Sequence, residues 1–111
     1  MMYGSFRHKE DNKMEIARTE AIDRLFESIL SLGSIDECYE YFEDLCTVKE
    51  ITDMSQRLEA AVKLDEGVSY QKIQESMKIS SATIGRVNRC LSYGTGGYKK
   101  IIERLRTADK K

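Results

Sequence analysis

The sequence predicts an all-α protein of six helices, and three observations lead to this prediction. Apolar residues recur at the three- and four-residue spacing of amphipathic helices along most of the chain. No stretch alternates between apolar and polar residues as a half-buried strand does. Proline is absent, so nothing forces a helix to break, and helix boundaries are expected at glycines and capping residues.

Length and composition suit one domain, because 111 residues with 41% hydrophobic content can supply one modest core. Residues 1–14 show no clean period and are expected to form a mobile extension, with residues 15–111 forming the domain. No apolar run approaches the roughly 20 residues needed to cross a bilayer, and no signal-peptide core is present. A soluble, cytoplasmic protein without membrane contact is therefore expected.

Metal and catalytic sites are not expected. The cysteines Cys38, Cys46 and Cys90 form no Cys-x-x-Cys pair, and His8 is the only histidine. A zinc site needs about four such ligands at close spacing, so we expect no metal and no cofactor, and thiols that act as small buried hydrophobes. No nucleophile–base pair or carboxylate dyad is identifiable, so the chain is not expected to be an enzyme.

Charge is uneven along the chain, although the formal net charge is only −1. Residues 1–77 hold nine Lys/Arg and seventeen Asp/Glu, a balance of −8, whereas residues 78–111 hold nine Lys/Arg and two Asp/Glu, a balance of +7. This asymmetry is typical of a surface that binds a polyanion, and equally of a solvated basic helix near the C-terminus.

The first three helices follow from apolar stripes and capping residues. A first helix is expected from about Glu15 until Gly33, and Ser34 with Glu37 predicts a capping box for the second. Thr47 starts a third helix, which ends at Gly67. The first helix carries an apolar stripe of Ile22, Leu25, Phe26, Ile29 and Leu30, and the third carries one of Ile51, Met54, Leu58, Ala61 and Val62. The second helix is expected to bury Cys38, Phe42 and Leu45. Apolar stripes this wide must pack against other helices, either in the core of a monomer or in the interface of a dimer.

Residues 69–92 have the pattern of a helix-turn-helix, two short helices joined by a tight corner. Ser69 and Ser80 are placed as N-caps, each worth about 1 kcal/mol. Residues that would fix the angle between the two helices are Ile73, Met77, Ile79, Ile84, Val87 and Leu91. This self-consistent set of apolar positions predicts that the second helix turns its opposite face to solvent.

That outward face suits duplex DNA. Small residues let the backbone approach base edges, arginine donates to guanine O6 and N7, and the helix start attracts phosphate. Lys99 and Lys100 would add affinity that falls with salt. The residues expected to contact DNA are Tyr70, Gln71, Lys78, Ser80, Ser81, Ala82, Thr83, Gly85, Arg86 and Arg89.

Two residues favour the plainer interpretation of an ordinary helical hairpin. Lys78 occupies the corner where glycine usually relieves a left-handed conformation, a strain of about 1–2 kcal/mol for other residues. Gly85 lies inside a helix, at a cost of about 1 kcal/mol relative to alanine. The hairpin therefore stays beside DNA binding as an alternative.

Residues 92–97 form a glycine-rich loop whose three glycines permit positive φ, but a phosphate-binding loop is not expected, because the required lysine and Ser/Thr are missing. A last helix follows. Its inward residues are Tyr98, Ile101, Ile102 and Leu105, and its outward residues are Lys99, Lys100, Arg104 and Arg106.

From about Leu25 to Leu105 the chain resembles the Trp-repressor-like superfamily, and most closely its small YerC/YecD-type branch. The stretches that carry the resemblance are LFESILSL, ECYEYFEDLCT, SQRLEAA and SATIGRVNRCLSYGTGGY. The resemblance implies a six-helix subunit in an intertwined two-fold dimer, whose first, second and last helices interlock. Two recognition helices about one DNA turn apart would then read a near-palindromic operator.

The resemblance also bears on the tryptophan corepressor. The indole-carboxylate site of the Trp repressor uses a threonine and two arginines, matched here by Thr47, Arg57 and Arg86. The next position is a glycine in the repressor, which leaves room for the indole, but it is Val87 here, and a later hydroxyl residue is Cys90. We therefore expect a plugged, vestigial pocket without tryptophan, in which Thr47 caps a helix and Arg57 forms an ion pair.

The predicted function is a sequence-specific DNA-binding transcriptional regulator, a repressor acting as a homodimer. One alternative is a helical interaction module that does not bind DNA and meets a basic partner. Its acidic face would be built from Asp36, Glu37, Glu40, Glu43 and Asp44. Another alternative is a repressor that responds to a small molecule other than tryptophan.

Overall fold

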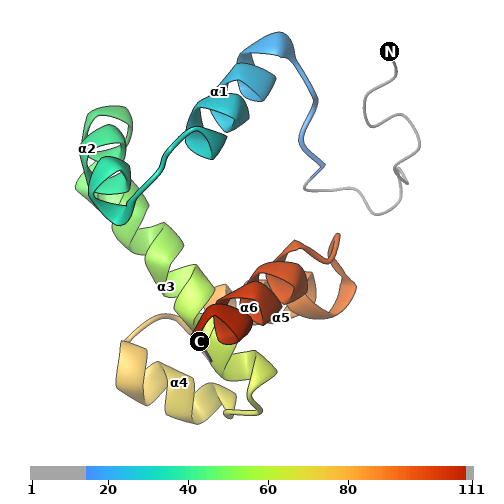
Figure 1. Ribbon diagram of the computed structural model, residues 1–111. Helices are drawn as coiled ribbons and strands as arrows, with labels where there is room; N and C mark the ends of the chain where they lie inside the picture. Colours follow the sequence, from blue (N-terminus) through green and yellow to red (C-terminus); the bar gives the residue numbers. More distant parts are fainter. Residues whose placement is uncertain (1–14, 110–111) are drawn as a thin grey trace. The chain divides into compact units, whose positions relative to one another are not determined.

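The computed structural model describes residues 15–109, and within them it contains six helices and no strand, which confirms the predicted all-α fold (Figure 1). The helices are α1 (Glu20–Leu30), α2 (Ile35–Leu45), α3 (Val48–Asp65), α4 (Tyr70–Met77), α5 (Ser81–Tyr93) and α6 (Gly97–Asp109). The expected N-terminal extension, residues 1–14, lies outside the described residues. None of the helices described is long and apolar enough to cross a membrane.

The chain divides into two compact units, one up to Tyr41 and one from Phe42. In the first unit, α1 begins after Thr19, whose hydroxyl oxygen accepts from the backbone N–H of Ile22 at 3.1 Å. The predicted start near Glu15 is therefore wrong, because residues 15–19 precede this helix and are not helical.

The predicted end of α1 at Gly33 is also wrong. The helix ends at Leu30, and its C-cap Ser31 keeps ordinary right-handed dihedrals, so no left-handed glycine is needed. Gly33 instead donates its N–H to the Glu37 carboxylate at 2.8 Å. The Ser34 hydroxyl accepts from the Glu37 N–H at 3.1 Å, so the predicted capping box forms with its return bond shifted by one residue.

The second unit carries the core. Seven buried residues, each at most 8% exposed, come from four helices: Ala60 and Ala61 of α3, Ile73 of α4, Ile84, Val87 and Leu91 of α5, and Ile102 of α6. Full burial of an aliphatic side chain contributes about 1.5–3 kcal/mol. The apolar residues predicted for the helix-turn-helix are therefore largely the core of the whole unit.

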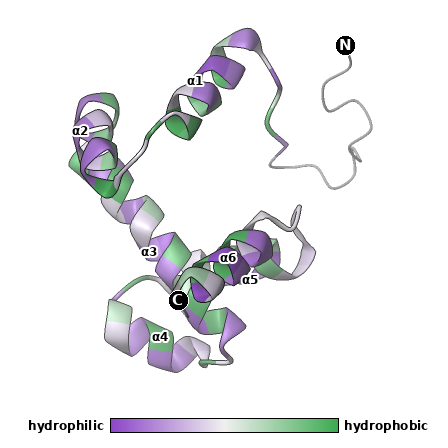
Figure 2. Ribbon diagram, in the orientation of Figure 1, coloured by the Kyte–Doolittle hydropathy of each residue, from purple (hydrophilic) through white to green (hydrophobic). Residues whose placement is uncertain are grey.

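Neither α1 nor α2 contains a buried residue. Helix α1 alternates between hydrophobic and hydrophilic residues along its length (Figure 2), and of the predicted stripe Phe26 is 48% and Leu30 82% exposed. Within the first unit the hydroxyls of Ser28 and Tyr41 are joined by a 2.6 Å hydrogen bond. Within the single chain the predicted inward position is wrong for Leu45, Ile101 and Leu105, each more than 40% exposed, and Met54 of the α3 stripe is 41% exposed.

Candidate nucleic-acid interface

Helix α4, the corner and helix α5 form the predicted helix-turn-helix. Ser69 accepts from the Lys72 N–H at 3.2 Å and Ser80 from the Thr83 N–H at 3.1 Å, so both serines are N-caps as predicted. Lys78 closes α4 in the left-handed conformation (φ 59°, ψ 41°), with its N–H bonded to the Gln74 carbonyl at 2.9 Å. The corner therefore carries the strain that the sequence predicted.

Buried aliphatic residues fix the angle between the two helices. Ile73 of α4 and Ile84 of α5 are fully buried, and Val87 is 1% exposed. Met77 and Ile79, at the end of α4 and in the corner, pack against this cluster. Because protein interiors are close-packed, these contacts hold α5 in one orientation relative to the rest of its unit.

The outer face of α5 lies opposite this core. Ser81, Ala82, Arg86 and Arg89 are exposed, and Gly85 faces open space, since a Cβ at this position would have no neighbouring atom within 4 Å. No residue of α5 is acidic. The structure therefore gathers two arginines and several small residues on one face, without a carboxylate in the same helix to neutralise them.

Other predicted contact residues have local roles. The Ser80 hydroxyl lies 3.0 Å from that of Thr83, and Thr83 is only partly exposed, so both belong to the N-cap of α5. Gln71 donates its side-chain amide to Glu75 at 3.3 Å. Tyr70, at the first position of α4, is 41% exposed, and Lys78 lies at the exposed corner.

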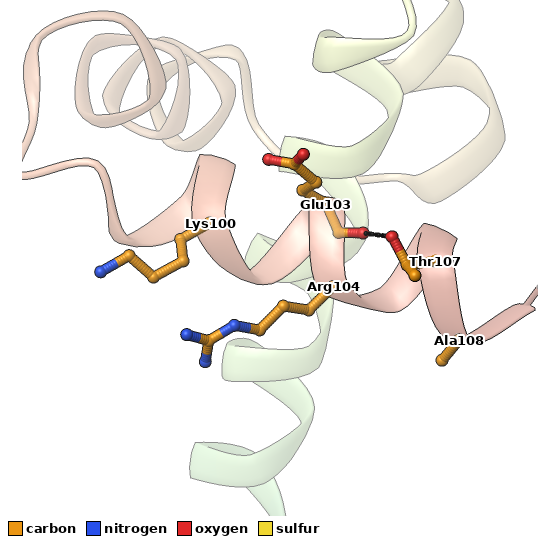
Figure 3. Close-up of a pocket in the computed structure, with 5 residues that line it drawn as sticks. All are labelled: Lys100, Glu103, Arg104, Thr107 and Ala108. Carbon is orange, nitrogen blue, oxygen red and sulfur yellow. Dashed lines mark hydrogen bonds between the residues drawn. The ribbon is translucent and has the colours of Figure 1, made fainter.

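The cations of α6 form two groups. Arg106 donates to Asp65 at 2.8 Å, and Lys99 lies 3.9 Å from the same carboxylate, so both are paired with the end of α3. Lys100 and Arg104 have no carboxylate within ion-pair distance among the residues described. They extend to one side of an open pocket lined by Lys100, Glu103, Arg104, Thr107 and Ala108 (Figure 3). A single helix supplies this lining, so the pocket does not enclose a ligand.

The residues predicted for the vestigial ligand pocket are only partly brought together. Arg57, Arg86 and Cys90 lie within electrostatic reach of the Tyr98 hydroxyl. Burial raises the pKa of Tyr98, the Arg57 guanidinium opposes that shift, the Cys90 thiol adds to it, and Arg86 lowers the pKa again. Thr47 lies ten residues before Arg57, about 15 Å away along α3.

Thr47 caps α3 as expected, in a complete capping box with Glu50, whose carboxylate accepts from the Thr47 N–H at 2.8 Å. The expected ion pair of Arg57 is not found among the described residues, where its electrostatic partner is the Tyr98 phenol. The sequence assigns Tyr98 to the inner face of α6 but does not indicate its place beside Arg57, because the spacing within one helix does not reveal what lies across from it.

No group of His, Cys, Asp and Glu residues in the described part of the chain is arranged to hold a metal ion. The three cysteines are free and half-buried, less enclosed than predicted.

Comparison with known proteins identifies the family. The model of the Trp repressor protein family matches residues 20–106, from the first residue of α1 into the last turns of α6. The chain belongs to the Trp repressor protein family. This confirms the predicted resemblance, and it places the chain among regulators of the DNA-binding type rather than in an enzyme family.

Relatives share most of the chain. The uncharacterized protein YerC of Bacillus subtilis (strain 168) is 47% identical over 92 residues, which cover 83% of this chain and 88% of YerC. The crystal structure of a TrpR-like protein from Eubacterium eligens ATCC 27750 is 50% identical, with a TM-score of 0.77 over 79% of this chain and 91% of its own. A candidate Trp repressor from Staphylococcus aureus is 44% identical, with a TM-score of 0.78 over 80% and 89%.

Proposed function

We propose that this member of the Trp repressor protein family is a sequence-specific transcriptional regulator that binds duplex DNA through α5 in the major groove. The observation that carries the proposal is the two-sided character of α5. One side is core, and the opposite side presents Ala82, Arg86 and Arg89 without any acidic residue in the helix. A helix of this kind fits the major groove and its negative potential.

The chemistry of the outer face suits base readout. Arg86 and Arg89 can donate in bidentate fashion to guanine O6 and N7, and the Ala82 methyl suits a thymine methyl. Gly85 leaves room for the helix backbone to approach the base pairs. Tyr70 and Lys78, beside the recognition helix, are suited to phosphate oxygens, which would fix the register of the protein on the duplex.

We further propose that the regulator acts as a homodimer on a near-palindromic operator. Helix α1 carries a wide apolar stripe but buries no residue within the chain, and Leu30 and Ile35 are 82% and 74% exposed. Large exposed aliphatic side chains on neighbouring helices are typical of a protein interface. A second copy would cover them, and its own α5 would lie about one DNA turn, roughly 34 Å, from the first.

Tryptophan is not part of this proposal. Val87 is 1% exposed and belongs to the core, which supports the expectation that its side chain takes the space that the flat indole requires. We expect a calorimetric titration of the full chain with tryptophan to show no micromolar binding. A dissociation constant in that range would contradict the plugged pocket and would favour a ligand-responsive repressor.

Selection from random duplex DNA with the purified chain tests specificity and palindromy together. We expect an enriched two-fold sequence, and a loss of operator affinity of at least about tenfold for Arg86→Ala or Arg89→Ala, because a good base contact is worth about 1–3 kcal/mol. Lys49→Ala is the matched control, because it removes one exposed cation from α3. If both arginine variants lose less than about threefold, the assignment of α5 is wrong.

Chromatography distinguishes the proposed regulator from the alternative, an interaction module that does not bind DNA. On a DNA column, the regulator should be retained at low salt and released steeply as salt rises. An interaction module should pass through at every salt concentration.

A further inference from the structure

We propose that Tyr93, the last residue of α5, contacts the sugar–phosphate backbone of the bound DNA, so that the two ends of α5 have different tasks. This inference rests on the proposed DNA-binding function and adds a contact residue that the sequence analysis did not include. The start of the helix would contact base edges, and its end would contact the sugar–phosphate backbone at the side of the groove.

Helical spacing places Tyr93 on the DNA-facing stripe. Ala82, Arg86, Arg89 and Tyr93 are separated by four, three and four residues, which aligns them along one side of a helix. All four are exposed, and Tyr93 is 86% exposed. The buried residues of α5, Ile84, Val87 and Leu91, lie on the other side. A single exposed aromatic residue is ordinary, but Tyr93 continues the line of Arg86 and Arg89 along the proposed DNA-facing side.

The length of the stripe assigns Tyr93 to the backbone rather than to the bases. Tyr93 lies eleven positions after Ala82, about 16 Å at 1.5 Å per residue. The major groove is about 12 Å wide, and recognition helices contact base edges with their N-terminal residues. In homeodomains the C-terminal end of the recognition helix contacts the DNA backbone, and we expect the same of Tyr93 at the end of α5.

Helix α5 ends at Tyr93, whose side chain is exposed. The Gly94 N–H donates to the Cys90 carbonyl at 2.9 Å, so the last turn is closed directly after Tyr93. A Cβ on Gly94 would collide with the same carbonyl, so the chain can turn away here only because this residue is glycine. The phenol hydroxyl can then donate to a phosphate oxygen, a contact that tyrosine commonly makes with DNA.

The test compares Tyr93→Phe, Tyr93→Ala and Arg89→Ala in the full chain, on the selected operator and on a scrambled duplex, over a series of salt concentrations. Tyr39→Phe is the matched control, since it removes the hydroxyl of another exposed tyrosine, on α2. We expect Tyr93→Ala to lower the affinity for both duplexes by the same factor, about three- to tenfold. Tyr93→Phe should show most of this loss, because it removes the hydroxyl that makes the contact. The salt slope should be unchanged by the tyrosine variants, which alter no charge, and Arg89→Ala should weaken binding to the operator more than binding to the scrambled duplex, because it removes a base contact.

Three results would overturn the inference. Unchanged DNA affinity in Tyr93→Ala would show that Tyr93 does not contact DNA. A loss of affinity for the operator alone would show that Tyr93 contacts bases rather than the backbone. A changed sedimentation mass in Tyr93→Ala would assign the side chain to contacts between copies. If the wild-type chain binds neither duplex, the proposed function itself fails, which is distinguishable from failure at Tyr93 alone.

Discussion

Helices α1 and α2 differ from helices α3 to α6 in how they use the same kind of sequence pattern. Both groups are amphipathic, yet all seven buried residues belong to α3–α6, and none belongs to α1 or α2. The groups also differ in charge, because α1 and α2 together hold eight acidic residues and one basic residue, whereas α3 to α6 together hold seven acidic and ten basic residues. An apolar stripe therefore specifies that a face must be covered, but not which molecule covers it.

The sharpest contrast between the two groups is expected in stability. Ile84→Ala removes a fully buried side chain, so it should lower the free energy of unfolding by about 2–5 kcal/mol at every protein concentration. Urea denaturation measures this. A loss below about 1 kcal/mol would mean that α5 is not anchored by this core.

Leu30→Asp tests the other group of helices, α1 and α2. Leu30 is 82% exposed in the single chain, so within the chain the change should matter little. In a dimer it would place a charge at the interface and forfeit about 1.5–3 kcal/mol of burial, enough to weaken association by at least tenfold. Sedimentation equilibrium should show a larger monomer fraction, and an unaltered mass distribution would exclude this part of α1 from the interface.

Gly85→Ala separates folding from recognition within α5. A methyl group meets nothing within 4 Å there, and alanine is the better helix former, so stability should rise by about 1 kcal/mol. Operator affinity should fall, because the methyl group would occupy the space between helix and bases. Thermal unfolding and a DNA titration of the same sample measure both effects. A variant that is more stable and binds equally well would show that the DNA does not approach α5 at Gly85.

Lys78→Gly should have the smallest effect. It relieves a left-handed conformation that costs about 1–2 kcal/mol, but glycine also gives the unfolded chain more freedom, so a net gain of about 0.5–1 kcal/mol is expected. Thermal unfolding checks the gain. Lys78→Gly should also reduce the salt slope of DNA binding, because the charge is lost. Lys78→Ala is the control: it should reduce the slope by the same amount but give no gain in stability.

The helix-turn-helix was predictable because its information is local. Ser69 and Ser80 cap the helices that they precede, and the apolar spacing on α5 selects Ile84, Val87 and Leu91 as its inner face. The end of α1 was not predictable from Gly33, because Ser31 closes the helix without a left-handed residue.

Contacts between residues far apart in the sequence could not be predicted either. Asp65 and Arg106 lie 41 positions apart, and Arg57 and Tyr98 belong to α3 and α6. Their pairing depends on how the four helices pack, which the spacing within any one helix does not encode. The DNA-binding roles of the α5 residues stay predictions, since the geometry makes them possible and only binding measurements test them.

The Asp65 carboxylate has a consequence for thermodynamics. It holds Arg106 at 2.8 Å and Lys99 at 3.9 Å, so two cations of α6 already have a fixed anionic partner within the protein. Only cations that neutralise phosphates release condensed counterions from the duplex, with a slope of about −0.9 per phosphate. In the proposed complex with DNA, the basic C-terminal third would thus displace fewer ions than its composition implies, and Asp65 would lower the response of association to ionic strength.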